Sequence, residues 1–171
     1  AKDSSFNGAN TFGTKRCGLN DNVWHYGAFT YDRLTGVSKL YVDGILDISQ
    51  TQSPNPTGAI GSTANAYIGS EGGTGNFFTG YLDDIKIYKY ARTAKQIIQD
   101  MNANAPSIGG PGTPGNAVAY WSMDEGQGTT ANDKSGNSKS LTLNTASWTN
   151  SGAFGKAWNG LGTNWLSRSD D

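Results

Sequence analysis

A carboxylate in an apolar strand is the residue of this sequence that points most directly to chemistry. Residues 81–88 predict a β-strand, and alternation along a strand puts Asp83 on one face with Ile85 and Ile87. Burying an unpaired carboxylate is costly, so Asp83 needs a cation or several hydrogen-bond donors. Ca²⁺ would meet this need, because it takes about six to eight oxygen ligands from carboxylates and loop carbonyls.

Two loops late in the chain carry further oxygen ligands. Residues 124–128 include Glu125, and residues 133–137 include Asp133 and Asn137. The sequence therefore predicts a structural calcium ion whose ligands are Asp83, Glu125, Asp133 and Asn137. An alternative interpretation is open: Asp83 caps backbone N–H groups at a sheet edge, and Glu125 and Asp133 stabilise turns.

Aromatic side chains form a second group with chemical potential, because their rings can stack on sugars. Of the five tryptophans, Trp24 and Trp121 sit in strands with apolar neighbours and are expected in the core. Phe77 and Phe78 are consecutive, so one of them must point outward if they belong to a strand. The residues predicted to bind carbohydrate are Tyr67, Phe77, Phe78 and Trp165.

The pattern does not indicate an enzyme. Glycosidases use two carboxylates roughly 5–9 Å apart, whereas Asp83 and Asp84 are adjacent and would face opposite sides of a strand. The single histidine, His25, is expected to be packed or hydrogen-bonded within a strand. The single cysteine, Cys17, is expected to be a small buried hydrophobe.

Short strands separated by turns must position these groups. The sequence predicts a hairpin turn at Asp43–Gly44, because both residues tolerate the positive φ of a type I′ turn. It predicts one helix over 93–102, begun by a capping box between Thr93 and Gln96 and carrying Ile97, Ile98 and Met101 on one face. The strands are predicted at 23–31, 37–42, 45–49, 66–69, 77–88, 117–123, 141–143, 146–149, 154–158 and 164–166.

Composition limits the partners. The 171 residues include 24 glycines and 11% aromatics, a composition that favours many short strands and tight turns. The net charge is −1. Because there is no basic patch and no apolar run near ~18 residues, neither nucleic acid binding nor membrane insertion is expected.

Several spaced motifs resemble one family. Residues 24–32, 40–44, 68–69 and 80–88 resemble the second half of bacterial laminin-G-like domains of the concanavalin-A-like superfamily. Residues 120–128, 133–137 and 155–157 resemble the opening of such a domain. The resemblance implies an all-β fold, a concanavalin-A-like jelly-roll β-sandwich with one short helix and its halves in permuted order.

The order of the parts governs the expected domains. Residues 1–105 are interpreted as the C-terminal half of a jelly roll and 116–171 as an N-terminal half, joined by a Gly/Pro linker at 106–115. The second part should dock on the first, so that Tyr120 and Trp121 share a folded unit with the strand that contains Asp83. A monomer is favoured, and a strand-exchanged oligomer is the alternative.

The resemblance also implies a function. It places the start and end of the domain next to each other, which would bring the late loops close to Asp83. It further implies a non-catalytic carbohydrate-binding or adhesion module of a larger secreted or cell-surface protein, with a carbohydrate or glycoconjugate as partner. The alternative is a structural spacer or assembly unit of a tandem-repeat extracellular protein that binds no small ligand.

Overall fold

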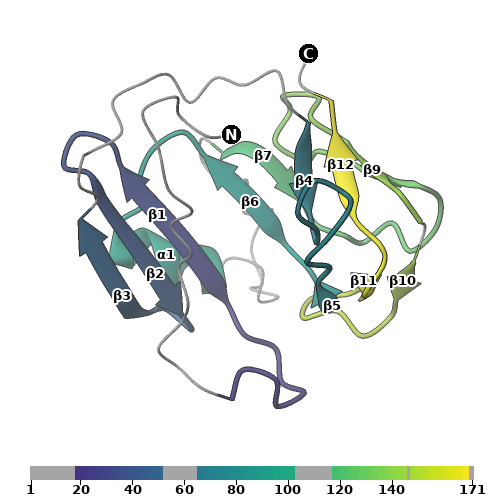
Figure 1. Ribbon diagram of the computed structural model, residues 1–171, viewed down its shortest axis with the longest axis horizontal. Coiled ribbons are helices and arrows are strands. Elements are labelled where there is room, and N and C mark those ends of the chain that lie inside the picture. Colours follow the sequence, from purple (N-terminus) through teal and green to yellow (C-terminus); the bar gives the residue numbers. More distant parts are fainter. Residues whose placement is uncertain (1–17, 52–64, 103–116, 146, 170–171) are drawn as a thin grey trace. The chain divides into compact units, whose positions relative to one another are not determined.

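The computed structural model of the protein describes residues 18–51, 65–102, 117–145 and 147–169 (Figure 1). The chain forms two compact units. The first unit comprises Ala1–Ser62 and Tyr90–Ala103, and the second comprises Thr63–Lys89 and Asn104–Asp171. Cys17 and the predicted linker 106–115 lie outside the described residues.

The first unit is built on a three-stranded antiparallel sheet of order β1-β2-β3. Its strands are β1 (Gly27–Asp32), β2 (Val37–Val42) and β3 (Ile45–Thr51). Asp43 and Gly44 join β2 to β3 with φ values of 52° and 76°. The predicted hairpin turn is therefore confirmed, because both central residues have the positive φ that a type I′ turn requires.

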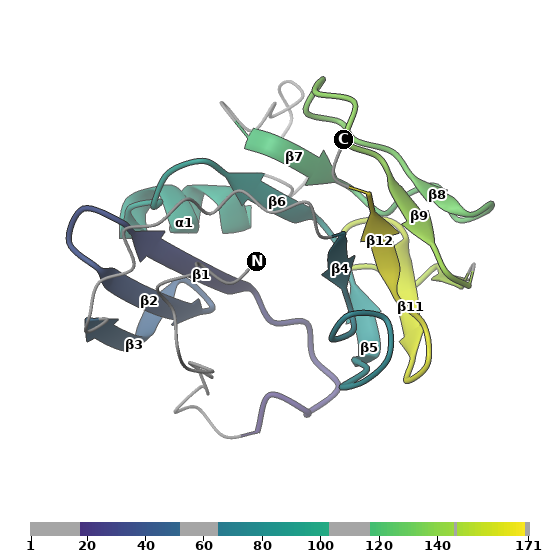
Figure 2. The same cartoon turned by 45° about the horizontal axis from the view of Figure 1, so that its top comes forward.

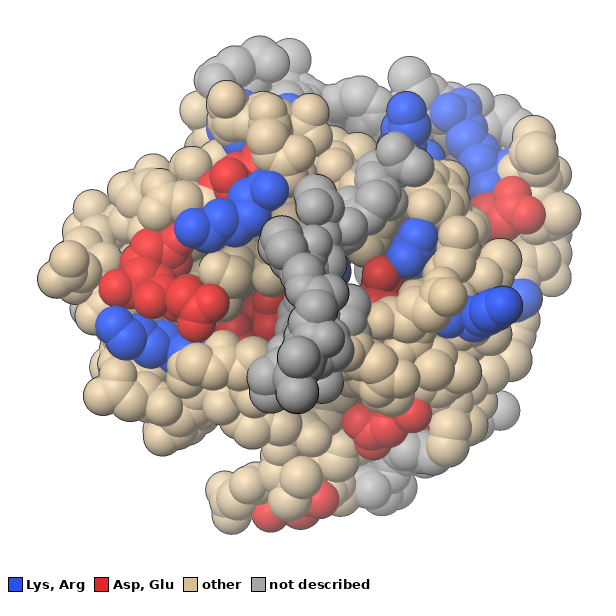
Figure 3. Space-filling model, turned by 180° about the vertical axis from the view of Figure 1, so that it is seen from behind, with Lys and Arg blue, Asp and Glu red and all other residues tan. Residues whose placement is uncertain are grey.

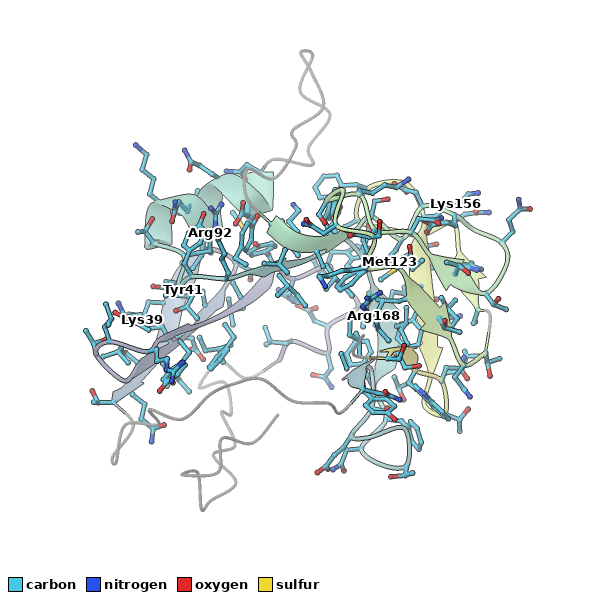
Figure 4. The ribbon with its side chains drawn as sticks, turned by 90° about the horizontal axis from the view of Figure 1, so that it is seen from above. Lys39, Tyr41, Arg92, Met123, Lys156 and Arg168 are labelled. Carbon is cyan, nitrogen blue, oxygen red and sulfur yellow. The ribbon has the colours of Figure 1, made fainter. Side chains whose placement is uncertain are left out.

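The helix α1 (Ala94–Asn102) also belongs to the first unit. Its capping box is confirmed: the Thr93 backbone N–H donates to Gln96 Oε1 at 2.9 Å, and the Gln96 N–H donates to Thr93 Oγ1 at 3.3 Å. Arg92, labelled beside the helix in Figure 4, forms an ion pair with the buried Asp100. The predicted apolar face is confirmed in part, since Ile97 is buried and Ile98 is 43% exposed.

The second unit contains three antiparallel sheets, of orders β4-β12-β9-β8, β10-β11-β5 and β6-β7 (Figures 1 and 2). Each sheet joins strands from before residue 90 to strands from after residue 116, and β6 pairs with β7 so that Ile85 lies opposite Trp121. The strands are β4 (Ala66–Ile68), β5 (Thr79–Leu82), β6 (Ile85–Tyr88), β7 (Ala117–Trp121), β8 (Thr130–Ala131), β9 (Leu141–Leu143), β10 (Trp148–Thr149), β11 (Ala157–Leu161) and β12 (Leu166–Arg168).

One predicted strand is wrong. Residues 77–88 form two strands rather than one, because Asp84 has a φ of 50° and interrupts the extended backbone. Beyond the interruption the chain changes partner: β5 pairs with β11, and β6 pairs with β7. The alternation that placed Asp83 on a face with Ile85 and Ile87 does not hold across this break, and Ile87 is 46% exposed.

All three sheets contribute residues to the core of the second unit. Its buried residues are Ala119, Trp121, Met123, Ala131, Leu141, Leu143, Trp158 and Leu166. The core position expected for Trp121 is confirmed. The same expectation for Trp24 is wrong, because Trp24 precedes β1 and is 37% exposed. Strands and one short helix make up the regular structure of the described residues, which confirms the all-β fold class.

Candidate functional site

Two of the predicted sugar-binding aromatics are brought together by strand pairing in the second unit. Tyr67 lies in β4, and Trp165 comes directly before β12. Because β4 pairs with β12 and Ser167 lies opposite Tyr67, alternation places Trp165 on the same face of the sheet as Tyr67. Phe77 contacts Trp165 with ring centroids 6.0 Å apart and an interplanar angle of 31°.

A glycine-rich loop packs against these rings. A Cβ atom added to Gly73 would lie 3.1 Å from Tyr67 Cε1 and 3.2 Å from Trp165 Cε2, so the bare backbone of Gly73 touches both side chains. The loop is held by its own hydrogen bonds: Gly73 N–H donates to Ser70 Oγ at 3.0 Å, and Glu71 N–H donates to the Gly75 carbonyl at 2.8 Å. Glycine is needed at position 73 for a second reason, since its φ is 75°.

We call Tyr67, Phe77 and Trp165, together with the loop 70–76, the aromatic site. Tyr67 is 37% exposed, whereas Phe77 and Trp165 are half-buried. Polar groups stand beside the rings: the Asn76 side-chain amide donates to Glu71 Oε2 at 2.5 Å. An exposed ring next to fixed hydrogen-bonding groups is the combination that can stack on a sugar and orient it.

Phe78 is not part of this cluster. It is 41% exposed, and its ring lies over Gly80, where an added Cβ atom would be 3.0 Å from Phe78 Cζ. The two consecutive phenylalanines precede β5 and do not belong to a strand, so the strand alternation expected for them does not apply, although Phe78 is the more exposed of the two.

Asp83 holds a loop that lies 71 residues further along the chain. Its Oδ2 accepts the backbone N–H of Phe154 at 3.0 Å, and its Oδ1 is buried without a hydrogen-bond partner among the described residues. Burial, together with the neighbouring carboxylates of Asp84 and Asp124, raises the pKa of Asp83 to about 6, although the Phe154 hydrogen bond acts to lower it. Capping of a backbone N–H group, the alternative interpretation of Asp83, is therefore observed.

Asp133 and Asn137 organise a turn. Asp133 accepts the N–H groups of Tyr120, Ser135 and Lys139 at 2.8–3.0 Å. Burial acts to raise the pKa of Asp133, but these hydrogen bonds outweigh it and lower the pKa below its usual value. The Asn137 side-chain amide donates to the Val118 carbonyl at 3.1 Å.

One of the two carboxylate oxygens of Glu125 forms hydrogen bonds. Its Oε1 accepts the backbone N–H and the side-chain amide of Asn132 at 2.9 and 3.0 Å. Its Oε2 is buried, and no described residue donates a hydrogen bond to it. Across the described ranges, no three His, Cys, Asp or Glu side chains are grouped so that they could hold a metal ion. The calcium site stays a prediction.

The sequence predicts that Tyr120 shares a folded unit with the strand of Asp83, but it assigns neither Tyr120 nor Asp124 a role in the surroundings of that carboxylate. The Tyr120 hydroxyl donates to Asp84 Oδ1 at 2.7 Å, and Asp124 Oδ1 accepts the Lys156 N–H at 3.0 Å. Burial raises the pKa of Tyr120, and the hydrogen bond to Asp84 raises it further. The β6–β7 pairing that creates this arrangement carries no local signal in the sequence.

His25 has a hydrogen-bonded role in the first unit. Its Nδ1 lies 3.0 Å from Asp43 Oδ2, and its Nε2 lies 3.1 Å from Asp21 Oδ1. The hydrogen bond with Asp43, followed by that with Asp21, raises the pKa of His25. The expectation of a hydrogen-bonded histidine is confirmed, although its position is just before β1 rather than within a strand.

Comparison with known protein families identifies the superfamily of the chain. Residues 3–98 match the model of the concanavalin A-like lectin/glucanases superfamily. The match covers more than half of the 171 residues, and the chain belongs to this superfamily. Its fold is accordingly that of a concanavalin-A-like β-sandwich. No curated protein and no solved structure matches the chain.

The superfamily gives a coarse functional class. Its laminin-G-like members are in general non-catalytic modules of carbohydrate binding or adhesion. On the face in Figure 3, several acidic side chains lie side by side, with basic side chains at their border and elsewhere on the same face. No helix among the described residues is long and apolar enough to cross a membrane.

Proposed function

We propose that the protein is a non-catalytic carbohydrate-binding module of a larger secreted or cell-surface protein, and that the aromatic site binds the sugar. The observation that carries this proposal is the convergence of Tyr67, Phe77 and Trp165 on one glycine-rich loop. These residues come from three separate segments. Packing of the core does not require their rings to meet at the surface, where Tyr67 is partly exposed.

The chemistry of the site suits a sugar. One face of a pyranose ring is lined by C–H groups, which pack against an aromatic ring, while its edge carries hydroxyl groups that need hydrogen-bond partners. Tyr67 offers an exposed ring, and the neighbouring Glu71 and Asn76 offer an acceptor and a donor. Gly73 supports Tyr67 and Trp165 from the loop side and fixes their positions before a ligand arrives.

The carboxylate with the raised pKa is poorly placed for hydrolysis. A general acid must reach the glycosidic oxygen, but Asp83 Oδ1 is buried and Oδ2 is occupied by the Phe154 N–H. We therefore assign Asp83 to structure rather than to proton transfer.

The proposal includes a structural calcium ion, and two buried oxygen atoms support it. Asp83 Oδ1 and Glu125 Oε2 are buried carboxylate oxygens without hydrogen-bond partners among the described residues, which is the donor chemistry that Ca²⁺ prefers. Asp133 and Asn137 do not fit the ligand set, because their side chains are engaged by the turn that they organise.

Glycan-array screening followed by affinity electrophoresis tests the function. Wild-type protein should bind at least one glycan, and Tyr67→Ala should weaken that binding at least about tenfold. Tyr81→Ala is the matched control, since Tyr81 is a 45% exposed tyrosine of β5 in the same unit and outside the aromatic site.

The spacer alternative makes the opposite prediction. A structural spacer would bind no glycan while remaining folded, and Tyr67→Ala would then behave like Tyr81→Ala in every assay. Circular dichroism of each variant separates loss of binding from loss of folding.

A further inference from the structure

A row of hydroxyl side chains crosses the sheet that carries Tyr67. In the register of β4-β12-β9-β8, Tyr67 lies opposite Ser167, Ser167 opposite Thr142, and Thr142 opposite Thr130. Residues opposite one another in neighbouring strands point to the same face. The four side chains therefore form one line perpendicular to the strands (sheet in Figure 2).

This row faces solvent. Thr130 and Thr142 are exposed, Tyr67 is 37% exposed and Ser167 is half-buried. The alternate positions of the same strands, namely Ala131, Leu141, Leu143 and Leu166, are all buried in the core. No described residue forms a hydrogen bond with the side-chain hydroxyl group of Thr130, Thr142 or Ser167.

The face carries little charge. Alternation in β12 puts Arg168 on the side of Leu166, opposite to Ser167, and its guanidinium donates to the Ser138 carbonyl at 3.2 Å. The charged residue of the aromatic site is Glu71. A face with hydroxyl groups, one aromatic platform and no described cation does not suit an anionic glycan.

The dimensions suit an extended chain. Neighbouring strands lie about 4.8 Å apart, so the row from Tyr67 to Thr130 spans roughly 14 Å, close to the length of about three pyranose units. The strand spacing is similar to the rise of one pyranose unit in an extended polysaccharide. Each strand of the row can thus offer one hydroxyl group to successive sugar units.

We propose that the row of Tyr67, Ser167, Thr142 and Thr130 continues the aromatic site as a binding track for an uncharged, extended polysaccharide laid across the strands. This inference rests on the proposed carbohydrate-binding function and names its ligand class. One sugar unit stacks at the aromatic site, and the following units donate hydrogen bonds to, and accept them from, the threonine and serine hydroxyls.

Calorimetric titration against oligosaccharide series tests the track. The probes are cello-, laminari- and manno-oligosaccharides of two to six units, with oligogalacturonates of the same lengths as the anionic counterpart. Affinity for at least one neutral series should rise up to about four units, and oligogalacturonates should bind at least about tenfold more weakly.

Variants of the row give the second readout. Thr142→Val keeps the shape and removes the hydroxyl, so it should weaken binding of the longer oligosaccharides about three- to tenfold and leave the disaccharide unchanged. Thr142→Ser should retain wild-type affinity. Thr51→Val, at an exposed threonine of β3 in the first unit, is the matched control.

The outcomes separate the two proposals. If Tyr67→Ala abolishes binding but affinity does not rise with chain length, or Thr142→Val binds long chains like wild type, the track is overturned and the carbohydrate-binding function stands. Equal binding of oligogalacturonates overturns the uncharged ligand class. Absence of binding to any glycan by folded wild-type protein overturns both proposals.

Discussion

Asp83 accepts a hydrogen bond from the backbone N–H of Phe154, which lies 71 residues further along the chain, at 3.0 Å. The other oxygen of the same carboxylate is buried and has no described hydrogen-bond partner. One side of Asp83 thus fastens a loop, while the other side leaves a buried oxygen unpaired. This asymmetry has measurable consequences.

The first concerns the dependence of stability on pH. The folded-state pKa of Asp83 is about 6, raised from 3.8, so folding disfavours ionisation of this group. Its stabilising contribution is full below pH 4 and is lost as pH rises through about 6. Asp83→Asn resembles the protonated form. We expect it to be more stable than wild type at pH 7, by on the order of 2 kcal/mol, and equally stable at pH 4.

Urea denaturation at the two pH values measures this difference. Asp83→Ala, which also removes the acceptor for the Phe154 N–H, should destabilise the protein at both pH values. An Asp83→Asn variant that is as unstable as Asp83→Ala at pH 7 would contradict the assignment.

The second prediction concerns calcium. If Ca²⁺ binds Asp83 Oδ1 and Glu125 Oε2, adding it to metal-stripped protein at pH 7.5 should raise the melting temperature, because a ligand of the native state stabilises that state. Asp83→Asn should abolish the rise, and Glu125→Gln should reduce it. Differential scanning calorimetry measures the shift, and an unchanged wild-type transition in millimolar Ca²⁺ would rule the ion out.

The third prediction concerns His25 in the first unit. Protonated His25 can donate to both Asp21 and Asp43, whereas the neutral ring has one N–H and can donate to one of them. Because the pKa of His25 is raised, its stabilising contribution is full below pH 6.5 and is lost as pH rises through the folded-state pKa.

His25→Gln should therefore flatten the decline in thermal stability between pH 6 and pH 9. Stability curves of wild type and variant that run parallel across this range would refute the linkage. Asp21→Asn is the matched partial change, since it removes the negative charge beside Nε2 and leaves that of Asp43 beside Nδ1.

The fourth prediction concerns the ion pair next to α1. Two nitrogens of Arg92 contact the two carboxylate oxygens of Asp100, at 2.9 Å for Nε and 2.6 Å for Nη2. Asp100 is buried, so Arg92→Ala leaves a buried charge without its partner and should cost about 3–5 kcal/mol. The double variant Arg92→Met, Asp100→Leu should recover most of this loss in the same denaturation assay. Equal destabilisation by the single and double variants would show that lost packing, and not an unpaired buried charge, causes the loss of stability.

Local features of the fold could be predicted from the sequence. The turn at Asp43–Gly44 and the capping box of Thr93 and Gln96 depend on residues a few positions apart, whose backbone preferences are written in their types. The break at Asp84 could not be predicted in this way. A left-handed non-glycine residue is sustained by its tertiary surroundings, here including the hydrogen bond from Tyr120.

The candidate site was predictable in type and not in arrangement. Tyr67, Phe77 and Trp165 could be chosen as aromatics near loops, but their meeting depends on the pairing of β4 with β12. The hydroxyl row depends on the same pairing and on its register. A register shift of one residue would move the side chains of the shifted strand to the other face of the sheet. The sequence leaves two roles open for Asp133, a calcium ligand or a residue that stabilises a turn, and its hydrogen bonds with neighbouring N–H groups place it at the centre of a turn.

The position of β12 in its sheet bears on how the protein folds. Leu166–Arg168 lies between β4 and β9, so β4 has no neighbour among the described strands of this sheet until the chain has been made as far as residue 168. Contacts so distant in sequence slow folding, into the millisecond-to-second range for sheets of this kind. During synthesis β4 therefore stays unpaired with β12 until the end of this segment is made. On a ribosome stalled before Leu166, Ile68 and Leu143 of the nascent chain would lack their partner residue and could be bound by chaperones.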